Sequence, residues 1–153
     1  MGPLRVTGGG AGQFRVEGGD NSVQGFGAEA GAGELRRAAA AVHAFVVARV
    51  GEEWRRACSL LSADEREALE RASPSSGPGS GGCAAALAHF TTRVSPSLAR
   101  AITTVDAASL RRAGERAFLL YTAPPGRTVY AMPMASEDGA WKLGAINGAV
   151  LPR

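Results

Sequence analysis

The side chains that could hold a metal ion in this sequence are few and lie far apart. Cys58 and Cys83 are its two cysteines, and His43 and His89 are its two histidines. Zinc sites take such ligands in close pairs, a few residues apart. No C-x-x-C or H-x-x-x-H spacing occurs here. We therefore expect no metal and no other cofactor.

Common catalytic and nucleotide-binding motifs are missing as well, since the sequence contains no G-x-S-x-G, H-E-x-x-H or P-loop pattern. Gly77, Gly79 and Gly82 formally match G-x-G-x-x-G, but no predicted strand precedes them and Pro78 lies among them. A dinucleotide-binding fingerprint needs a strand that leads into a helix. We interpret residues 73–82 as a low-complexity loop.

The two cysteines form either a disulfide or a pair of buried thiols. We favour a Cys58–Cys83 disulfide, because each cysteine lies beside the end of a predicted helix that flanks the loop at residues 73–82. Such a bond would indicate an oxidising compartment.

Length and composition describe one globular domain of 153 residues, 45% of them hydrophobic, with a net charge of +3. No apolar run approaches the ~20 residues that cross a bilayer. The arginine pairs at 36–37, 55–56 and 111–112 are scattered and have no interleaved aromatic residues. A nucleic-acid surface needs clustered basic residues beside stacking rings, so we expect no nucleic-acid partner.

Residues 1–33 are rich in glycine and show no signal-peptide pattern. Such a composition buries too little apolar surface to offset the entropy of ordering the backbone. We expect a flexible tether over residues 1–33 and a single domain over residues 34–153. Alternating apolar residues at 13–17 and 22–26 leave open an extended strand across the domain.

Helices are predicted first along the domain. Apolar residues at three- and four-residue steps define one face of a helix at residues 34–50, and Arg49 lies off that face. A second helix follows over residues 54–61. Ser62 and Glu65 match a capping box for a third helix that ends near residue 72. A fourth covers residues 83–93, and Ser95-Pro96 opens a short turn to residue 100.

Four strands follow, at residues 102–112, 116–123, 127–136 and 140–146. The second is apolar on both faces, so helices must cover one face and a cavity wall or a partner subunit the other. Pro133 lacks an N–H and predicts an edge or a bulge.

This order of elements resembles the nuclear transport factor 2-like (cystatin-like) superfamily. The stretches that carry the resemblance are EEWRRACSLLS at 52–62, GERAFLLY at 114–121 and EDGAWKLG at 137–144. The resemblance covers about residues 34–152 and implies a cone-shaped α+β fold, with N-terminal helices packed on a curved antiparallel sheet. The chain is similar to the extracytoplasmic actinobacterial branch, which implies a secreted or lipoprotein-type protein, held at a membrane only through an anchor before residue 1.

Catalytic members of this superfamily place an Asp or a His with a Tyr inside the cone, where they move a proton on an apolar substrate. The resemblance makes five residues candidates for that role: Asp106, His43, His89, Tyr121 and Tyr130. The two histidines lie beside apolar helix faces, as core-edge histidines do, and the aspartate suits a solvated strand face. We therefore rank catalysis below binding.

We expect a non-catalytic, extracytoplasmic domain that binds a small apolar ligand or a protein partner. Aromatic and methionine side chains fill irregular gaps in cores and pockets. The expected lining is Tyr121, Tyr130, Met132, Met134 and Trp141. The second form of the binding hypothesis is a homodimer that forms through the sheet face. The alternative function is a cofactor-free lyase or isomerase that uses Asp106, His43 and Tyr121.

Overall fold

The computed structural model describes residues 1–73 and 81–153, so most of the predicted loop at 73–82 lies outside the described residues. The helices are η1 (Ala11–Phe14), α1 (Ala32–Val50), α2 (Trp54–Ser59), α3 (Ala63–Ala72), α4 (Gly82–His89) and α5 (Pro96–Thr103). The strands are β1 (Leu4–Val6), β2 (Ala28–Glu29), β3 (Val105–Ala113), β4 (Arg116–Thr122), β5 (Val129–Glu137), β6 (Ala140–Leu143) and β7 (Ala149–Val150).

The protein has an α+β fold in which a mainly antiparallel sheet curls strongly into a half barrel. Strands β3, β4, β5 and β6 form an antiparallel meander. At each edge of the sheet, two short strands pair with different parts of the same long strand. On β3, β1 pairs in parallel and β2 pairs antiparallel further along. On β5, β6 and β7 pair with opposite halves of the strand.

Pro133 lies inside the sheet at the gap between those two short strands. It is paired with Phe118 of β4, while β6 pairs from Met134 onward and β7 pairs with Tyr130 and Ala131. The Pro133 carbonyl accepts a 2.7 Å hydrogen bond from the Gly144 N–H. A missing N–H is tolerated here because no strand requires a donor at this position.

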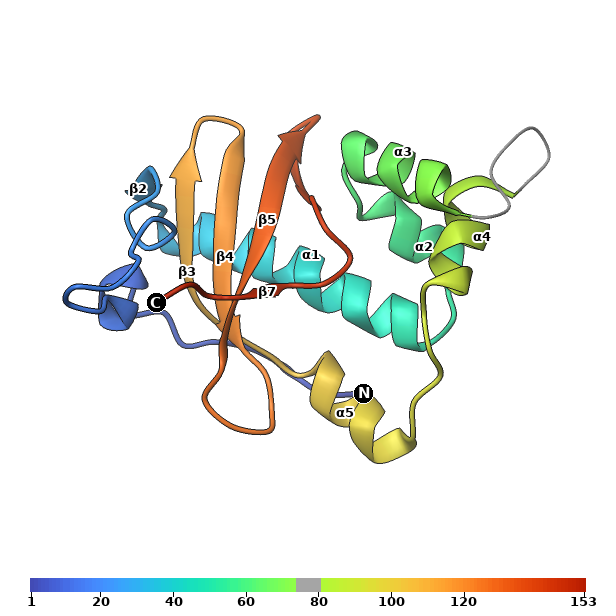
Figure 1. Ribbon diagram of the computed structural model, residues 1–153, viewed down its shortest axis with the longest axis horizontal. Coiled ribbons are helices and arrows are strands. Elements are labelled where there is room, and N and C mark those ends of the chain that lie inside the picture. Colours follow the sequence, from blue (N-terminus) through green and yellow to red (C-terminus); the bar gives the residue numbers. More distant parts are fainter. Residues whose placement is uncertain (74–80) are drawn as a thin grey trace.

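The inner face of the sheet packs against α1, which passes behind β3, β4 and β5 in Figure 1. Helices α2, α3 and α4 cluster at one end of α1. The apolar stripe of α1 is buried as its periodicity predicts. The inner-face core from the sheet comprises Val105, Ala107, Leu110, Ala117, Leu119, Tyr121, Met132, Met134, Trp141 and Leu143.

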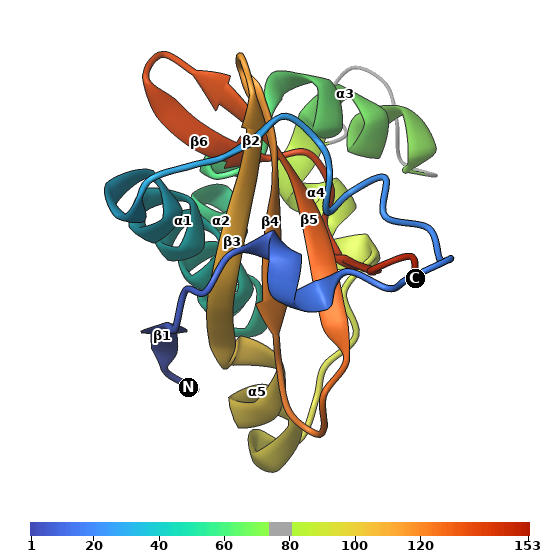
Figure 2. The same ribbon diagram turned by 90° about the vertical axis from the view of Figure 1, so that its left-hand side faces the viewer.

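The outer face of the sheet is covered by the protein's own N-terminal segment and C-terminal end (Figure 2). Ala11 of η1 and Leu151 are buried with the outward side chains Leu120, Val129 and Ala131. Three side chains complete this second core: Phe14, Val23 and Phe118. Residues of the same chain therefore cover the apolar outer face of β4.

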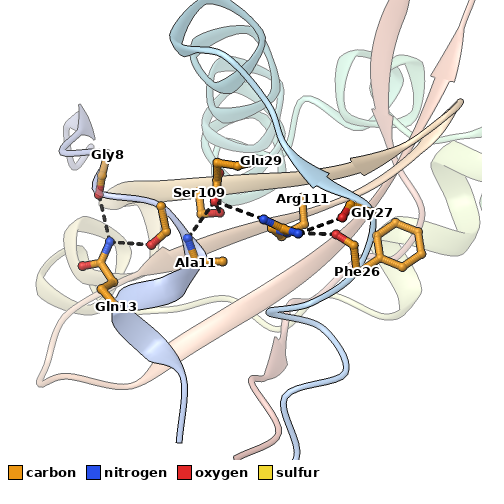
Figure 3. Close-up of polar contacts among 9 residues, drawn as sticks. Gly8, Ala11, Gln13, Phe26, Gly27, Glu29, Ser109 and Arg111 are labelled. Atoms are coloured by element: carbon orange, nitrogen blue, oxygen red, sulfur yellow. Dashed lines mark hydrogen bonds and ion pairs between the residues drawn. The ribbon is translucent and has the colours of Figure 1, made fainter.

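Residues 1–33 thus do not form the flexible tether that their glycine content predicted. Two carboxylate oxygens of Glu29 hold the segment to β3 (Figure 3). They accept hydrogen bonds from the Ala11 N–H at 2.8 Å and from the buried Ser109 hydroxyl at 2.9 and 2.7 Å. Arg111 donates to the carbonyls of Phe26 and Gly27, both at 2.8 Å. Hydrogen bonds between polar side chains and backbone groups need no apolar side chain, so composition does not reveal them.

Local boundaries follow the predicted caps. The Ser62 hydroxyl accepts from the Glu65 N–H at 3.2 Å, which begins α3. The Ser95 hydroxyl accepts from the Leu98 N–H, and Pro96 occupies the first turn of α5. This helix continues to Thr103, so the strand predicted from residue 102 begins only at Val105.

The predicted disulfide is confirmed. The Cys58 and Cys83 sulfurs are bonded at 2.13 Å, with their Cα atoms 6.1 Å apart. The bond joins α2 to α4 and is compatible with an oxidising compartment.

Candidate functional site

A cavity of about 400 Å³ lies between the last two turns of α1, the inner face of the sheet and three connecting loops. Its walls come from α1, the α4–α5 connection, α5, β4, the β4–β5 connection, β5 and the β6–β7 connection. The apolar lining comprises Val46, Val50, Phe90, Ile102, Ala123, Pro124, Met132 and Ile146. Phe90 and Ile102 are also exposed to solvent, so they mark the mouth of the cavity.

Arg49 is the charged residue of this cavity, and it joins three segments of the chain. Its Nε donates to the Thr91 hydroxyl at 2.8 Å, and its Nη1 donates to the Ile146 carbonyl at 2.7 Å and to Asn147 Oδ1 at 2.9 Å. Its Nη2 donates to the Phe90 carbonyl at 3.2 Å. All four acceptors are neutral groups. No ion pair among the described residues includes Arg49, and burial lowers the pKa of its guanidinium.

Tyr121 supplies the most buried polar group of the cavity wall. Burial, followed by the proximity of Tyr130, raises the pKa of the Tyr121 phenol to about 12. The hydroxyl is therefore protonated at neutral pH and acts as a hydrogen-bond donor, not as a base. The rings of Tyr121 and Tyr130 lie 5.7 Å apart. In the described part of the chain, no hydrogen bond joins the Tyr121 hydroxyl to the protein.

Gly148 lies directly against the Tyr121 hydroxyl, and a Cβ at this position would clash with it. The preceding residue, Asn147, contacts Arg49. Two consecutive residues of one loop therefore touch the guanidinium and the phenol, so these two polar groups share a wall of the cavity.

The predicted acid–base candidates are not brought together. Tyr121 and Tyr130 line the cavity, whereas Asp106, His43 and His89 do not. Asp106 alternates with Val105 and Ala107 of the inner core, so it lies on the outer face of β3. It accepts a 2.8 Å hydrogen bond from the Thr7 hydroxyl. His43 Nε2 lies 2.8 Å from the Gly2 carbonyl, so it fastens the N-terminal segment.

The remaining candidates divide between core and cavity. The His89 ring packs edge-on against Phe90 at 5.0 Å. Met132 lines the cavity, while Met134 and Trp141 are buried in the inner core outside it. The expected pocket residues Tyr121, Tyr130 and Met132 therefore share one site.

Sequence reasoning missed Arg49 and its loop partners. The helical pattern placed Arg49 off the apolar stripe of α1, which commonly means exposure to solvent. The structure instead covers that side of the helix with the α4–α5 and β6–β7 connections. The available signal is its place in the last turn of α1, where a cation interacts favourably with the helix dipole.

Comparisons with known proteins add no further constraint: no family model, no curated protein and no solved structure matches the chain. Within residues 1–73 and 81–153, no cluster of three or more His, Cys, Asp or Glu side chains could hold a metal ion. Among the same residues, no helix combines the length and apolar character needed to span a bilayer.

Proposed function

We propose that this protein binds a small, mainly apolar molecule in the inner cavity and performs no chemical step on it. The observation that carries the proposal is the cavity itself, whose volume of about 400 Å³ lies within the ~300–1,000 Å³ common for ligand sites. Its lining is mainly apolar with a few convergent polar groups, the usual character of such sites. The alternative, a lyase or isomerase, lacks support because Asp106 and His43 lie away from Tyr121.

We further propose membership of the nuclear transport factor 2-like superfamily and an extracytoplasmic location. Helices that precede a curled antiparallel meander, with a cavity between α1 and the sheet, support the first. The Cys58–Cys83 disulfide supports the second. A protein partner or second copy on the sheet is less favoured, because residues of the N-terminal segment already cover the outer face.

Titration with a neutral apolar dye such as Nile red tests the binding proposal. Ile102 lines the cavity at its mouth and is exposed, so Ile102→Trp should block entry without disturbing the core. Val46→Trp should fill the cavity from α1. Ala40 is exposed on the same helix, which makes Ala40→Trp the matched control. Saturable binding that is retained in Ala40→Trp and lost in the two cavity variants is expected; equal binding by all four proteins would reject the proposal.

A further inference from the structure

The electrostatics of the cavity are unbalanced. A guanidinium carries five N–H donors, and four neutral acceptors contact that of Arg49. One donor on Nη2 remains, and the positive charge has no carboxylate partner among the described residues. Arg49 is half-buried, and even partial removal of a charge from water is costly unless an opposite charge compensates it. An anionic group in the cavity would supply that compensation.

A second donor is available on the same wall. The Tyr121 hydroxyl is protonated and makes no hydrogen bond to the described protein, and Gly148 leaves no side chain in front of it. Asn147 and Gly148 are adjacent in the chain, and neighbouring Cα atoms lie about 3.8 Å apart. These two residues touch Arg49 and Tyr121 respectively, and both donors line the same cavity. Most of the remaining lining is apolar, including Val46 and Met132.

We propose that the ligand of the cavity is an amphipathic monocarboxylate, bound with its carboxylate between Arg49 and Tyr121 and its apolar body against Val46 and Met132. This inference rests on the proposed binding function. The recognised feature is the carboxylate, since a guanidinium donates to this group with favourable geometry. Arg49 can hold the two loops and bind a carboxylate at the same time. Its hydrogen bonds to the loops leave one N–H donor over, and their acceptors do not neutralise its charge.

Calorimetric titration of the full chain with decanoate and with decanamide tests the carboxylate inference separately from the proposed binding function. The two probes share one apolar chain and differ in the charge of the head group. Hydrogen bonds that involve a charged group contribute about 1.5–3 kcal/mol, which corresponds to a dissociation constant at least about tenfold lower for decanoate. Added salt should weaken decanoate binding and leave decanamide binding nearly unchanged.

Charge removal at one site supplies the second arm of the experiment. Arg49→Gln should bring the two dissociation constants to within about twofold of one another. Arg36→Gln removes the same charge from an exposed position of α1 and should retain the preference. Because Arg49 also joins two loops, Tyr121→Phe provides an independent variant that keeps the ring and the charge. It should weaken decanoate binding several-fold.

The outcomes are distinct. Equal affinity for decanoate and decanamide in the unaltered protein would overturn the carboxylate inference and leave the cavity as a neutral apolar site. A preference for decanoate that survives Arg49→Gln would overturn it too. Binding of neither probe, together with no binding of Nile red, would reject the proposed function itself.

Discussion

The indole N–H of Trp141 donates a 2.9 Å hydrogen bond to Oε2 of Glu34, which joins β6 to the first turn of α1. Arg112 contacts the same oxygen at 3.2 Å, and its guanidinium lies 5.3 Å from the centre of the Trp141 ring. Arg37 donates to the other oxygen at 2.6 Å. The hydrogen bond from Arg37, followed by that from Trp141, lowers the pKa of Glu34. One carboxylate thus connects the helix to the inner side of the sheet.

This arrangement predicts a graded response to substitution of Trp141. Trp141→Ala removes a buried aromatic ring and should lower the free energy of unfolding by about 3–5 kcal/mol. Trp141→Phe keeps much of the apolar contact and should cost about 1 kcal/mol, since Glu34 retains two arginines and is partly solvated. Urea unfolding measures both values.

Trp54 provides the matched control, because it is partly buried and its indole makes no hydrogen bond to the described protein. Trp54→Phe should therefore cost less than Trp141→Phe. Equal costs for the two substitutions would show that the bond to Glu34 contributes nothing measurable.

The attachment of the N-terminal segment predicts that Glu29 is a stabilising residue despite its position in a glycine-rich stretch. Glu29→Ala leaves the buried Ser109 hydroxyl and the Ala11 N–H without their acceptor, which should cost about 1–3 kcal/mol. Glu17 is exposed in the same segment, so Glu17→Ala should change the unfolding free energy by less than about 0.5 kcal/mol.

Deletion of residues 1–26 tests the same attachment more severely. It uncovers Leu120, Val129 and Ala131 on the outer face, so the melting temperature should fall by several degrees and binding of hydrophobic dyes should rise. An unchanged melting temperature would restore the interpretation of this segment as a tether.

The sequence was informative wherever side-chain periodicity decides the structure. The buried stripe of α1, the doubly apolar strand at residues 116–122 and the Ser62 cap followed from local patterns. The N-terminal segment did not, because Leu4–Val6 and Glu29 attach to β3 by backbone and carboxylate hydrogen bonds. Hydrogen bonds of this kind leave no apolar repeat in the sequence.

The site was only partly predictable for a related reason. Tyr121, Tyr130 and Met132 alternate along predicted strands, so a shared face could be expected. Arg49 enters the cavity only because two loops, distant from it in sequence, fold over the end of α1. Loop placement depends on tertiary contacts that a single sequence does not encode as a pattern.

The disulfide predicts a large stability difference between oxidised and reduced protein. In the chain-entropy model, closing the loop between Cys58 and Cys83 stabilises the fold by about 3.5 kcal/mol. Replacing both cysteines by alanine should therefore lower the free energy of unfolding by roughly that amount, and reductant should have no further effect on the variant. Intact mass after alkylation in denaturant checks the bond: without reductant the unaltered protein should take up no alkyl group, and with reductant it should take up two.

Tyr121 predicts a loss of stability in alkaline solution. The pKa of this phenol is about 12 in the folded protein, against about 10 for an unfolded chain. Below pH 10 the phenol is protonated in both states, so its titration does not reduce the free energy of unfolding. Between pH 10 and 12 the unfolded chain loses the proton while the folded protein keeps it, so unfolding becomes easier as the pH rises. Two pH units correspond to about 2–3 kcal/mol.

Tyr121→Phe should remove this part of the pH dependence, as measured by the urea midpoint between pH 9 and 12. At neutral pH the variant should be at least as stable as the unaltered protein, because the lost hydroxyl makes no hydrogen bond to the described protein. An identical alkaline slope in both proteins would show that Tyr121 is not the buried phenol described here. A variant that is stable yet binds decanoate weakly would instead assign the hydroxyl to the ligand rather than to the fold.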